Sequence, residues 1–223
     1  GLINESDRWE QYIQSAIIDA TINKDILMDT PINKPALLRQ TFELGASYSG
    51  ELLSLNKMLG SLQDAGNTVT LAGYINLLNE SGLLCGLQKF SIDNARRKAS
   101  IPKLQVYNNA LKMVYNSLSF EQSLLDRKHW GRIFESGIGA YLVSQAFTHR
   151  FEVYYWRERN DEVDFILRKN NSLIAIEVKS NAEKNTSGLD KFRQHFNPDK
   201  AFIVGEGGIT PEEFLSMNIK KLF

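Results

Sequence analysis

Apolar residues recur every three or four positions along most of the first 80 residues, which is the spacing of helices with one buried face. We therefore expect four helices, over residues 5–29, 37–48, 51–62 and 68–81. Prolines, glycines and short polar runs separate these segments and mark their ends. The first part of the chain is thus predicted to be helical.

Two strand-like runs follow the helices. They are LLCGLQKF at residues 83–90 and KLQVYN at 103–108, with a polar, basic stretch at 93–98 between them. Three helices and a basic hairpin are typical of a winged helix-turn-helix, in which residues 68–81 would read DNA. That helix contains no Lys or Arg, so phosphate contacts would come from the hairpin. The alternative is a packing module that holds neighbouring domains.

The second half of the chain alternates helical and strand-like patterns. The expected elements, in order, are helices at 108–127 and 130–147, three strands within 151–180, a helix at 188–196, a strand at 201–205 and a helix at 211–217. A strand, helix, strand connection favours a parallel crossover, so we expect a mixed sheet flanked by helices. The predicted fold class is α/β (α+β), with domains at 1–107 and 108–223.

The alternation of apolar and polar residues in two neighbouring strands places acidic residues and a lysine on defined strand faces. In IAIEVKS, Ala175, Glu177 and Lys179 share one face, opposite Ile174, Ile176 and Val178. In EVDFILR, Asp164 and Ile166 are expected opposite Val163, Phe165 and Leu167. Residues 169–172 tolerate a tight turn, so the two strands form a hairpin that brings Asp164 near Glu177. Glu135, on the helix at 130–147, would either face this sheet or lie in solvent.

Composition and charge indicate a folded globular protein and argue against a disulfide-stabilised one or one with a membrane-spanning helix. The chain has 223 residues, of which 43% are hydrophobic, enough for folded cores. Lys plus Arg and Asp plus Glu both number 26, so net charge does not indicate a partner. The single cysteine, Cys85, excludes an internal disulfide framework and indicates a cytoplasmic protein. No apolar run reaches the about 18 residues of a membrane helix.

The acidic residues and the lysine suit metal-dependent phosphodiester hydrolysis. Asp164 and Glu177 offer the hard oxygen ligands that Mg²⁺ or Mn²⁺ prefers, and Glu135 would be an auxiliary ligand. Lys179, two residues after Glu177, would orient the nucleophile or stabilise charge on the phosphate. The alternative is that Glu177 and Lys179 form a surface ion pair on an edge strand, which would contribute only about 0 to 1 kcal/mol.

This set of residues resembles the PD-(D/E)XK nuclease superfamily. A glutamate on a helix, then Asp164, then Glu177-Val178-Lys179 matches its motif in type and order, although Val163 stands where the motif has proline. The resemblance implies a restriction endonuclease-like domain. It also implies catalytic roles for Glu135, Asp164, Glu177 and Lys179, and metal binding by the three acids.

Longer runs resemble a narrower family. YSGELLSLNKMLGSLQDAGNTVTLAGYINLLNESGLL, WGRIFESGIGAYL, YYWRERNDEVDFIL and LIAIEVKS look like the C-terminal part of prokaryotic P-loop (AAA+ type) ATPases that carry the region called DUF4143. The resemblance implies an ATPase domain, a winged-helix segment and a nuclease-like domain, in that order. The chain contains no G-x-x-x-x-G-K-[ST], and its first residue is glycine. We therefore expect a C-terminal fragment without a nucleotide site.

Two functions follow as alternatives. One is a nuclease that cuts DNA, driven by the missing ATPase domain. The other is a non-catalytic module that binds DNA or protein for that ATPase. In either case the sequence leaves open whether the protein forms a homo-oligomer.

Overall fold

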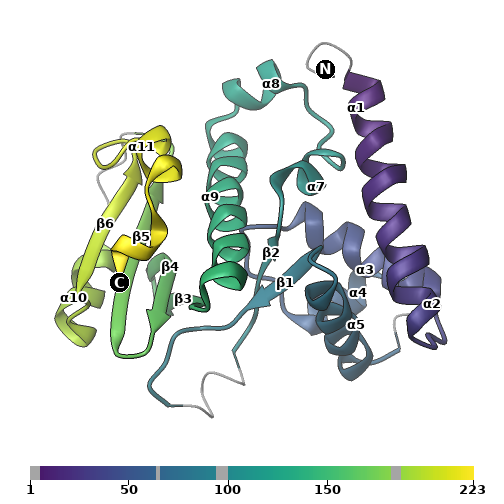
Figure 1. Cartoon of the computed structure of the whole chain (residues 1–223), viewed down its shortest axis with the longest axis horizontal. Coiled ribbons are helices and arrows are strands. Elements are labelled where there is room, and N and C mark those ends of the chain that lie inside the picture. The colour runs from purple at the N-terminus through teal and green to yellow at the C-terminus, as the bar shows by residue number, and fades with distance from the viewer. Residues whose placement is uncertain (1–5, 64–65, 94–99, 182–186) are drawn as a thin grey trace.

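The computed structural model describes residues 6–63, 66–93, 100–181 and 187–223. Helix α9 (Arg127–His149) lies between two parts of the molecule (Figure 1). On one side are the N-terminal helices and a two-stranded sheet, and on the other is a four-stranded sheet with its own helices. The predicted mixture of helices and strands is confirmed.

Helices form in all four of the predicted N-terminal segments, although one begins later than predicted. A helix runs from residue 6 to 29, and its middle widens into π-helical turns. The segments are α1 (Ser6–Tyr12), η1 (Ile13–Asp19), η2 (Thr21–Ile26), α2 (Leu27–Asp29), α3 (Pro35–Ser47), α4 (Leu55–Ser61) and α5 (Thr68–Glu80). Their apolar faces meet in one core that contains Ile18, Leu38, Phe42, Met58 and Leu71. Burial of these faces stabilises helices too short to persist alone.

One predicted helix begins later than its apolar pattern suggests. Residues 51–54 are not helical, and α4 begins after Ser54, whose hydroxyl accepts a hydrogen bond from the Lys57 N–H. Leu52 instead forms a β-bridge with Lys103, and the Gly50 N–H donates to the Leu104 carbonyl at 2.8 Å. The prediction of helix over 51–54 is wrong because pairing with a distant strand holds this segment extended.

The prediction of one continuous helix over residues 108–127 is also wrong. The chain forms α7 (Asn109–Met113) and α8 (Phe120–Leu125) instead. Ser119 caps α8 in a capping box with Gln122, which starts a new helix where the apolar periodicity runs on without a break.

The two-stranded sheet joins the two halves of the molecule. Strand β1 (Leu84–Leu87) pairs antiparallel with β2 (Lys103–Val106). Cys85 and Leu87 belong to the core beneath α9 and the larger sheet. Most of the basic stretch predicted at 93–98 lies outside the described residues, which resume at 100.

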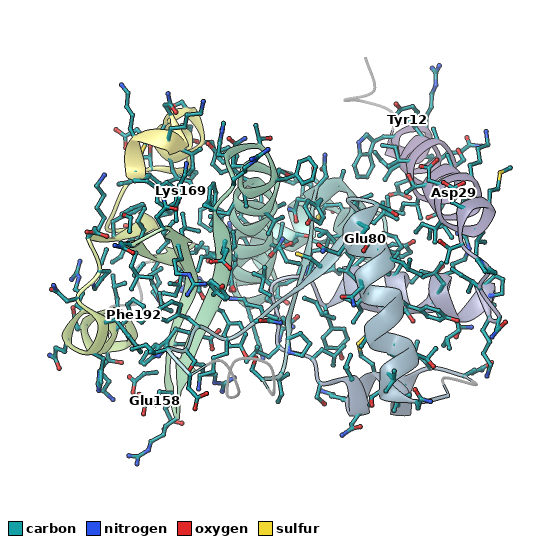
Figure 2. All side chains as sticks on the ribbon, turned by 60° about the horizontal axis from the view of Figure 1, so that its bottom comes forward. Tyr12, Asp29, Glu80, Glu158, Lys169 and Phe192 are labelled. Carbon is teal, nitrogen blue, oxygen red and sulfur yellow. The ribbon has the colours of Figure 1, made fainter. Side chains whose placement is uncertain are left out.

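The larger sheet has the predicted mixed topology. Its strands, in the order β3-β4-β5-β6, are β3 (Glu152–Glu158), β4 (Asp161–Lys169), β5 (Ser172–Lys179) and β6 (Lys200–Gly205). The first three are antiparallel, and β6 lies parallel to β5 after the crossover helix α10 (Ser187–Phe196). Glu158 and Lys169 mark opposite ends of this sheet (Figure 2).

Helices cover both faces of the larger sheet. On one face, Ile138 and Leu142 of α9 share a core with Ile174 and Ile176. On the other, Phe192 of α10 packs with Ala175 and with aromatic residues of β3. The chain ends in α11 (Pro211–Ser216) and a 3₁₀ turn, η3 (Ile219–Leu222). Among the described helices, none combines the length and apolar character needed to cross a membrane.

The predicted alternation holds in β5 and fails in β4. Ile174 and Ala175 lie in different cores, as expected. Val163, however, belongs to the α10 core, whereas Phe165 belongs to the α9 core. Tyr154 pairs with Ile166 and Trp156 with Val163, so β4 carries an extra residue here. This β-bulge at residues 164–165 resets the alternation beside Asp164.

Gly205, at the end of β6, packs its Cα closely against the main chain of Lys179 on β5, where a larger residue does not fit. Its φ is +105°, and an added Cβ would clash with the main-chain carbonyl of Lys179. We expect Gly205→Ala to lower the free energy of unfolding by about 3 kcal/mol. Gly207→Ala is the control, because its φ is +78° but nothing lies within 4 Å, so it should cost only about 1 kcal/mol. Equal urea-unfolding losses would contradict this account.

Candidate active site

The acid on helix α9 faces the end of the sheet. Asp126 caps this helix by accepting hydrogen bonds from the Lys128 and His129 N–H groups. Glu135 lies two turns further along, and its side chain is 22% exposed. One turn later, Gly139 lets the helix approach the side chains of Gln105 and Phe165, since a Cβ there would clash with both. This close packing brings Glu135 to the carboxylates of β4.

Asp164 lies at the bulge in β4 and bridges to the next strand. Its Oδ2 accepts a hydrogen bond from the Val178 N–H at 2.7 Å. The main-chain pairing of β4 with β5 ends at Phe165 and Ile176. Beyond that pair, the Asp164 side chain accepts the hydrogen bond that a main-chain carbonyl would otherwise accept. This bond fixes the carboxylate beside the segment that carries Glu177 and Lys179.

Glu177 and Lys179 form a close ion pair away from the surface. Lys179 Nζ lies 2.7 Å from Glu177 Oε1, and the side chains are 22% and 9% exposed, respectively. Strand β5 is interior, with β4 on one side and β6 on the other. The alternative of a surface pair on an edge strand is therefore wrong.

Lys103 is a member of this cluster that the sequence analysis missed. Its side chain is 1% exposed, and its Nζ forms an ion pair with Glu135. The same Nζ lies 3.6 Å from Asp164 Oδ1 and donates to the Asp164 carbonyl oxygen at 3.3 Å. A weaker contact of 3.8 Å reaches Glu162. The signal available in the sequence was a lysine that opens an apolar strand, KLQV.

The structure thus brings together all four residues predicted from the sequence. Glu135 and Asp164 meet through Lys103, and Asp164 reaches the strand of Glu177 and Lys179 through the Val178 N–H. The result is a group of acids and amines between α9, β2 and the hairpin, in which Lys103, Asp164 and Glu177 are buried and Glu135 and Lys179 are partly exposed.

Electrostatics at the site favour proton retention by two of the acids. Burial, reinforced by the nearby Asp164 carboxylate, raises the pKa of Glu135 to about 8, although Lys103 opposes this shift. Burial and Asp164 likewise raise the pKa of Glu177 to about 7, with Lys179 opposing. Burial alone would lower the pKa of Lys103, but the carboxylates of Glu135, Asp164 and Glu162 raise it. Burial alone would likewise lower the pKa of Lys179, but the carboxylates of Glu177, Asp164 and Glu135 together raise it, so both lysines stay charged.

These shifts predict that stability falls as pH rises. The folded protein holds a proton on Glu177 up to pH about 7, whereas the unfolded chain releases it near 4.5. The folded state binds more protons in this window, so its free energy of unfolding should fall between pH 5 and 8, by on the order of 2 kcal/mol for Glu177. Urea unfolding with EDTA present measures this. Glu177→Gln should flatten the pH dependence, and an unchanged slope would contradict the assignment.

The carboxylate oxygens of Glu135, Asp164 and Glu177 are of the chemical type that binds a divalent cation such as Mg²⁺. Three acids face two lysines, which leaves one carboxylate without a neutralising partner when all are ionised. Among the described residues, Glu177 Oε2 is buried and has no hydrogen-bond partner. The described residues include no group of three or more His, Cys, Asp or Glu arranged to hold a metal ion. The Lys103 ammonium pairs with Glu135 and lies 3.6 Å from Asp164 Oδ1, so Glu177 Oε2 is the buried oxygen of this cluster that lacks a partner within the described part of the chain.

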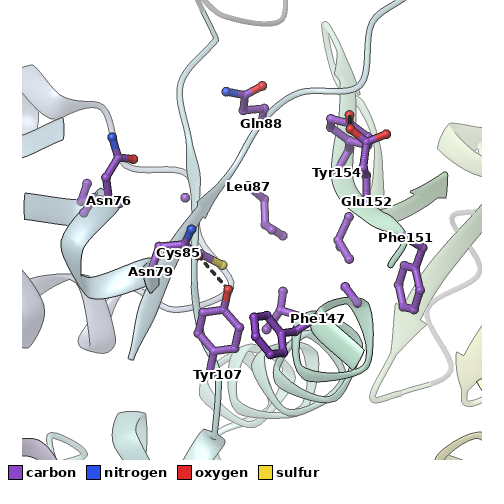
Figure 3. Close-up of a pocket in the computed structure, with 15 residues that line it drawn as sticks. Asn76, Asn79, Cys85, Leu87, Gln88, Tyr107, Phe147, Phe151, Glu152 and Tyr154 are labelled. Atoms are coloured by element: carbon purple, nitrogen blue, oxygen red, sulfur yellow. Dashed lines mark hydrogen bonds between the residues drawn. The ribbon is translucent and has the colours of Figure 1, made fainter. Parts of the chain in front are cut away.

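A separate groove of about 470 Å³ lies between β1 and the start of β3 (Figure 3). Tyr107 donates a hydrogen bond to Asn79 Oδ1 at 2.7 Å on its wall. Glu152, at its rim, is paired with Arg168 at 2.7 Å. The groove is thus lined by amide, aromatic and aliphatic side chains and does not include the residues of the carboxylate cluster.

Several other residues have structural roles. Cys85 is buried, and burial raises the pKa of its thiol to about 12. Tyr155 and Trp156 pack in the cores on opposite faces of the sheet. The interpretation of these side chains as core residues is confirmed.

Two family matches cover most of the sequence. The domain of unknown function DUF4143 matches residues 130–214, so the predicted resemblance to the DUF4143 region is confirmed. All four predicted site residues lie within this range. The domain of unknown function DUF8612 matches residues 2–122, which contain Lys103. No curated protein and no solved structure matches the chain. Because residues 2–122 are 121 of 223, the chain belongs to the family described as a domain of unknown function (DUF8612), and it carries a DUF4143 domain after it.

Proposed function

We propose that this protein hydrolyses phosphodiester bonds in DNA with Mg²⁺ or Mn²⁺ held at the carboxylate cluster. The observation that carries the proposal is the buried Glu177–Lys179 pair beside Asp164, with one glutamate oxygen left unpartnered. An exposed pair of this kind would contribute little. A buried carboxylate oxygen without a hydrogen bond is costly, and acids with raised pKa values cluster at functional sites.

The residues have separate roles in this proposal. Asp164 Oδ1 and Glu177 Oε2 would hold the cation, and Glu135 would be an auxiliary ligand once Lys103 releases it. A bound divalent cation would screen the phosphate charge and lower the pKa of an attacking water. Lys179 would orient the nucleophile and stabilise negative charge that develops on the phosphate. The short contact with Glu177 holds the lysine amine in position for that role.

The proposed fold and context follow the same resemblance. The order α9, β3, β4, β5, α10, β6 is that of the PD-(D/E)XK core, so we infer a restriction endonuclease-like domain. Helices α3 to α5 with β1 and β2 would form the winged helix. The proposed partners are DNA and a P-loop ATPase domain on the same polypeptide.

Plasmid cleavage tests the proposed activity. The full chain, alone and joined to the ATPase domain that we infer, would be incubated with supercoiled plasmid and Mg²⁺ or Mn²⁺. We expect nicked or linear DNA that EDTA abolishes. Intact plasmid under every metal condition would remove the nuclease assignment.

A second candidate is a non-catalytic module that binds DNA or protein. It is favoured by Lys103, which already neutralises part of the cluster. The absence of Lys and Arg from α5 means that any DNA contacts would come from other elements. This candidate predicts DNA binding that weakens with salt and no cleavage. A titration of labelled duplex at several salt concentrations measures it, and the absence of salt-dependent binding would leave protein interaction as the role.

A further inference from the structure

We propose that Lys103 is a built-in competitor of the metal, so that the N-terminal part of the chain controls whether the carboxylate cluster can bind a divalent cation. The inference rests on the proposed function, because it concerns the same site. It adds a regulatory contact between the DUF8612 and DUF4143 segments, which contribute the lysine and the acids, respectively.

The contacts of the Lys103 ammonium are those that a cation would make. Nζ pairs with Glu135 and lies 3.6 Å from Asp164 Oδ1. A divalent ion held by Asp164 Oδ1 would have to lie within a few ångströms of this charge, where like charges repel strongly in a buried site. Glu135 cannot serve both partners. The ammonium therefore competes with a metal for two of the three acids, whereas Lys179 pairs with Glu177 alone.

Lys103 reaches the acids from the strand that joins the two halves of the molecule. Its main chain is held by β1, through Leu87, and by the bridge to Leu52. Two positions later on β2, the Gln105 amide donates to the Ser136 carbonyl of α9 at 2.9 Å. Ser136 Oγ also lies 2.8 Å from Ser49 Oγ, just after α3. Because the Lys103 side chain is 1% exposed, it leaves the acids only if this junction opens.

This arrangement differs from an ordinary buried ion pair in one respect. Glu177 Oε2 has no hydrogen-bond partner while Lys103 is in place. A cluster evolved only for structural pairing would satisfy that oxygen. With Lys103 withdrawn and a divalent cation bound, Glu135 would exchange the ammonium for the metal, and Glu177 Oε2 would gain a partner. The metal-free form is thus the closed state of a switch.

Metal affinity in matched lysine variants tests the proposal. Mn²⁺ binding would be measured by calorimetry at pH 8 for wild type, Lys103→Met and Lys112→Met. Lys112 is the control, since it is also buried but donates to the Ser47 and Ser49 carbonyls. We expect Lys103→Met to bind Mn²⁺ at least about tenfold more tightly than wild type, because a competing charge is gone. Lys112→Met should match wild type.

The outcomes separate the two proposals. Equal or weaker binding by Lys103→Met overturns the competition but leaves the metal site. No binding by either protein contradicts the metal site itself, and with it both proposals. If Lys103→Met does not fold, amine labelling of wild type followed by mass spectrometry decides instead. Labelling of Lys103 should rise severalfold in saturating Mn²⁺ while that of Lys112 stays constant, and unchanged labelling of Lys103 overturns the competition.

Discussion

Asp164→Asn should lower the rate of metal-dependent plasmid cleavage by about a thousandfold or more. Asparagine keeps the shape of the side chain, so its amide oxygen still accepts a hydrogen bond from the Val178 N–H, and the hairpin stays closed. The substitution removes the negative charge that a divalent cation needs. Single-turnover cleavage of supercoiled DNA in Mg²⁺ measures the loss.

Asp161→Asn is the matched control for this experiment. Asp161 lies on the same strand, but its carboxylate pairs with Lys191 and accepts from the Ser187 hydroxyl, outside the cluster. We expect its cleavage rate to stay within about twofold of wild type, because its carboxylate is held by Lys191 and Ser187 and does not contact the cluster. Comparable rates for Asp164→Asn and wild type would show that the cluster does not carry the reaction.

Lys179→Ala should reduce the cleavage rate by about a hundredfold or more and leave Mn²⁺ binding intact. The lysine acts on the developing phosphate charge, and removing one such group costs about 10² to 10³ in rate. It is not a ligand, and its loss makes the cluster more negative, so the metal is retained. Cleavage assays and calorimetry on the same preparation separate the two effects.

The control for the lysine is Lys169→Ala at the far end of β4. Its amine lies 5.5 Å from the Phe223 ring and does not contact the acids. That variant should cleave DNA at the wild-type rate. If Lys179→Ala also cleaves at the wild-type rate, the nuclease proposal should be dropped.

The helices and the mixed sheet follow from local patterns. Periods of 3.6 and 2 residues report which side chains face a core, and the Lys169–Ser172 turn closes the β4–β5 hairpin as predicted. The parallel placement of β6 follows from the crossover through α10. These features depend on residues close in sequence, so the sequence alone discloses them.

Features that depend on distant contacts were not predictable in this way. Lys103 donates to Asp164 across 61 positions, and no local pattern indicates such a contact. The extended segment at 50–53 depends on Leu104 and Lys103 in the same manner. The bulge in β4 changes which face a residue occupies without changing the alternation of residue types. The predicted acids nevertheless meet, because the Asp164 side chain closes the hairpin at the bulge.

Binding of Mn²⁺ to the full wild-type chain tests the central claim most directly. Calorimetry at pH 6 should detect one ion per chain and release of protons, since Glu135 and Glu177 still hold protons at that pH and must lose them to bind metal. Glu177→Gln should weaken this binding by at least about tenfold. Absence of saturable binding in wild type, or equal affinity in Glu177→Gln, would contradict the account.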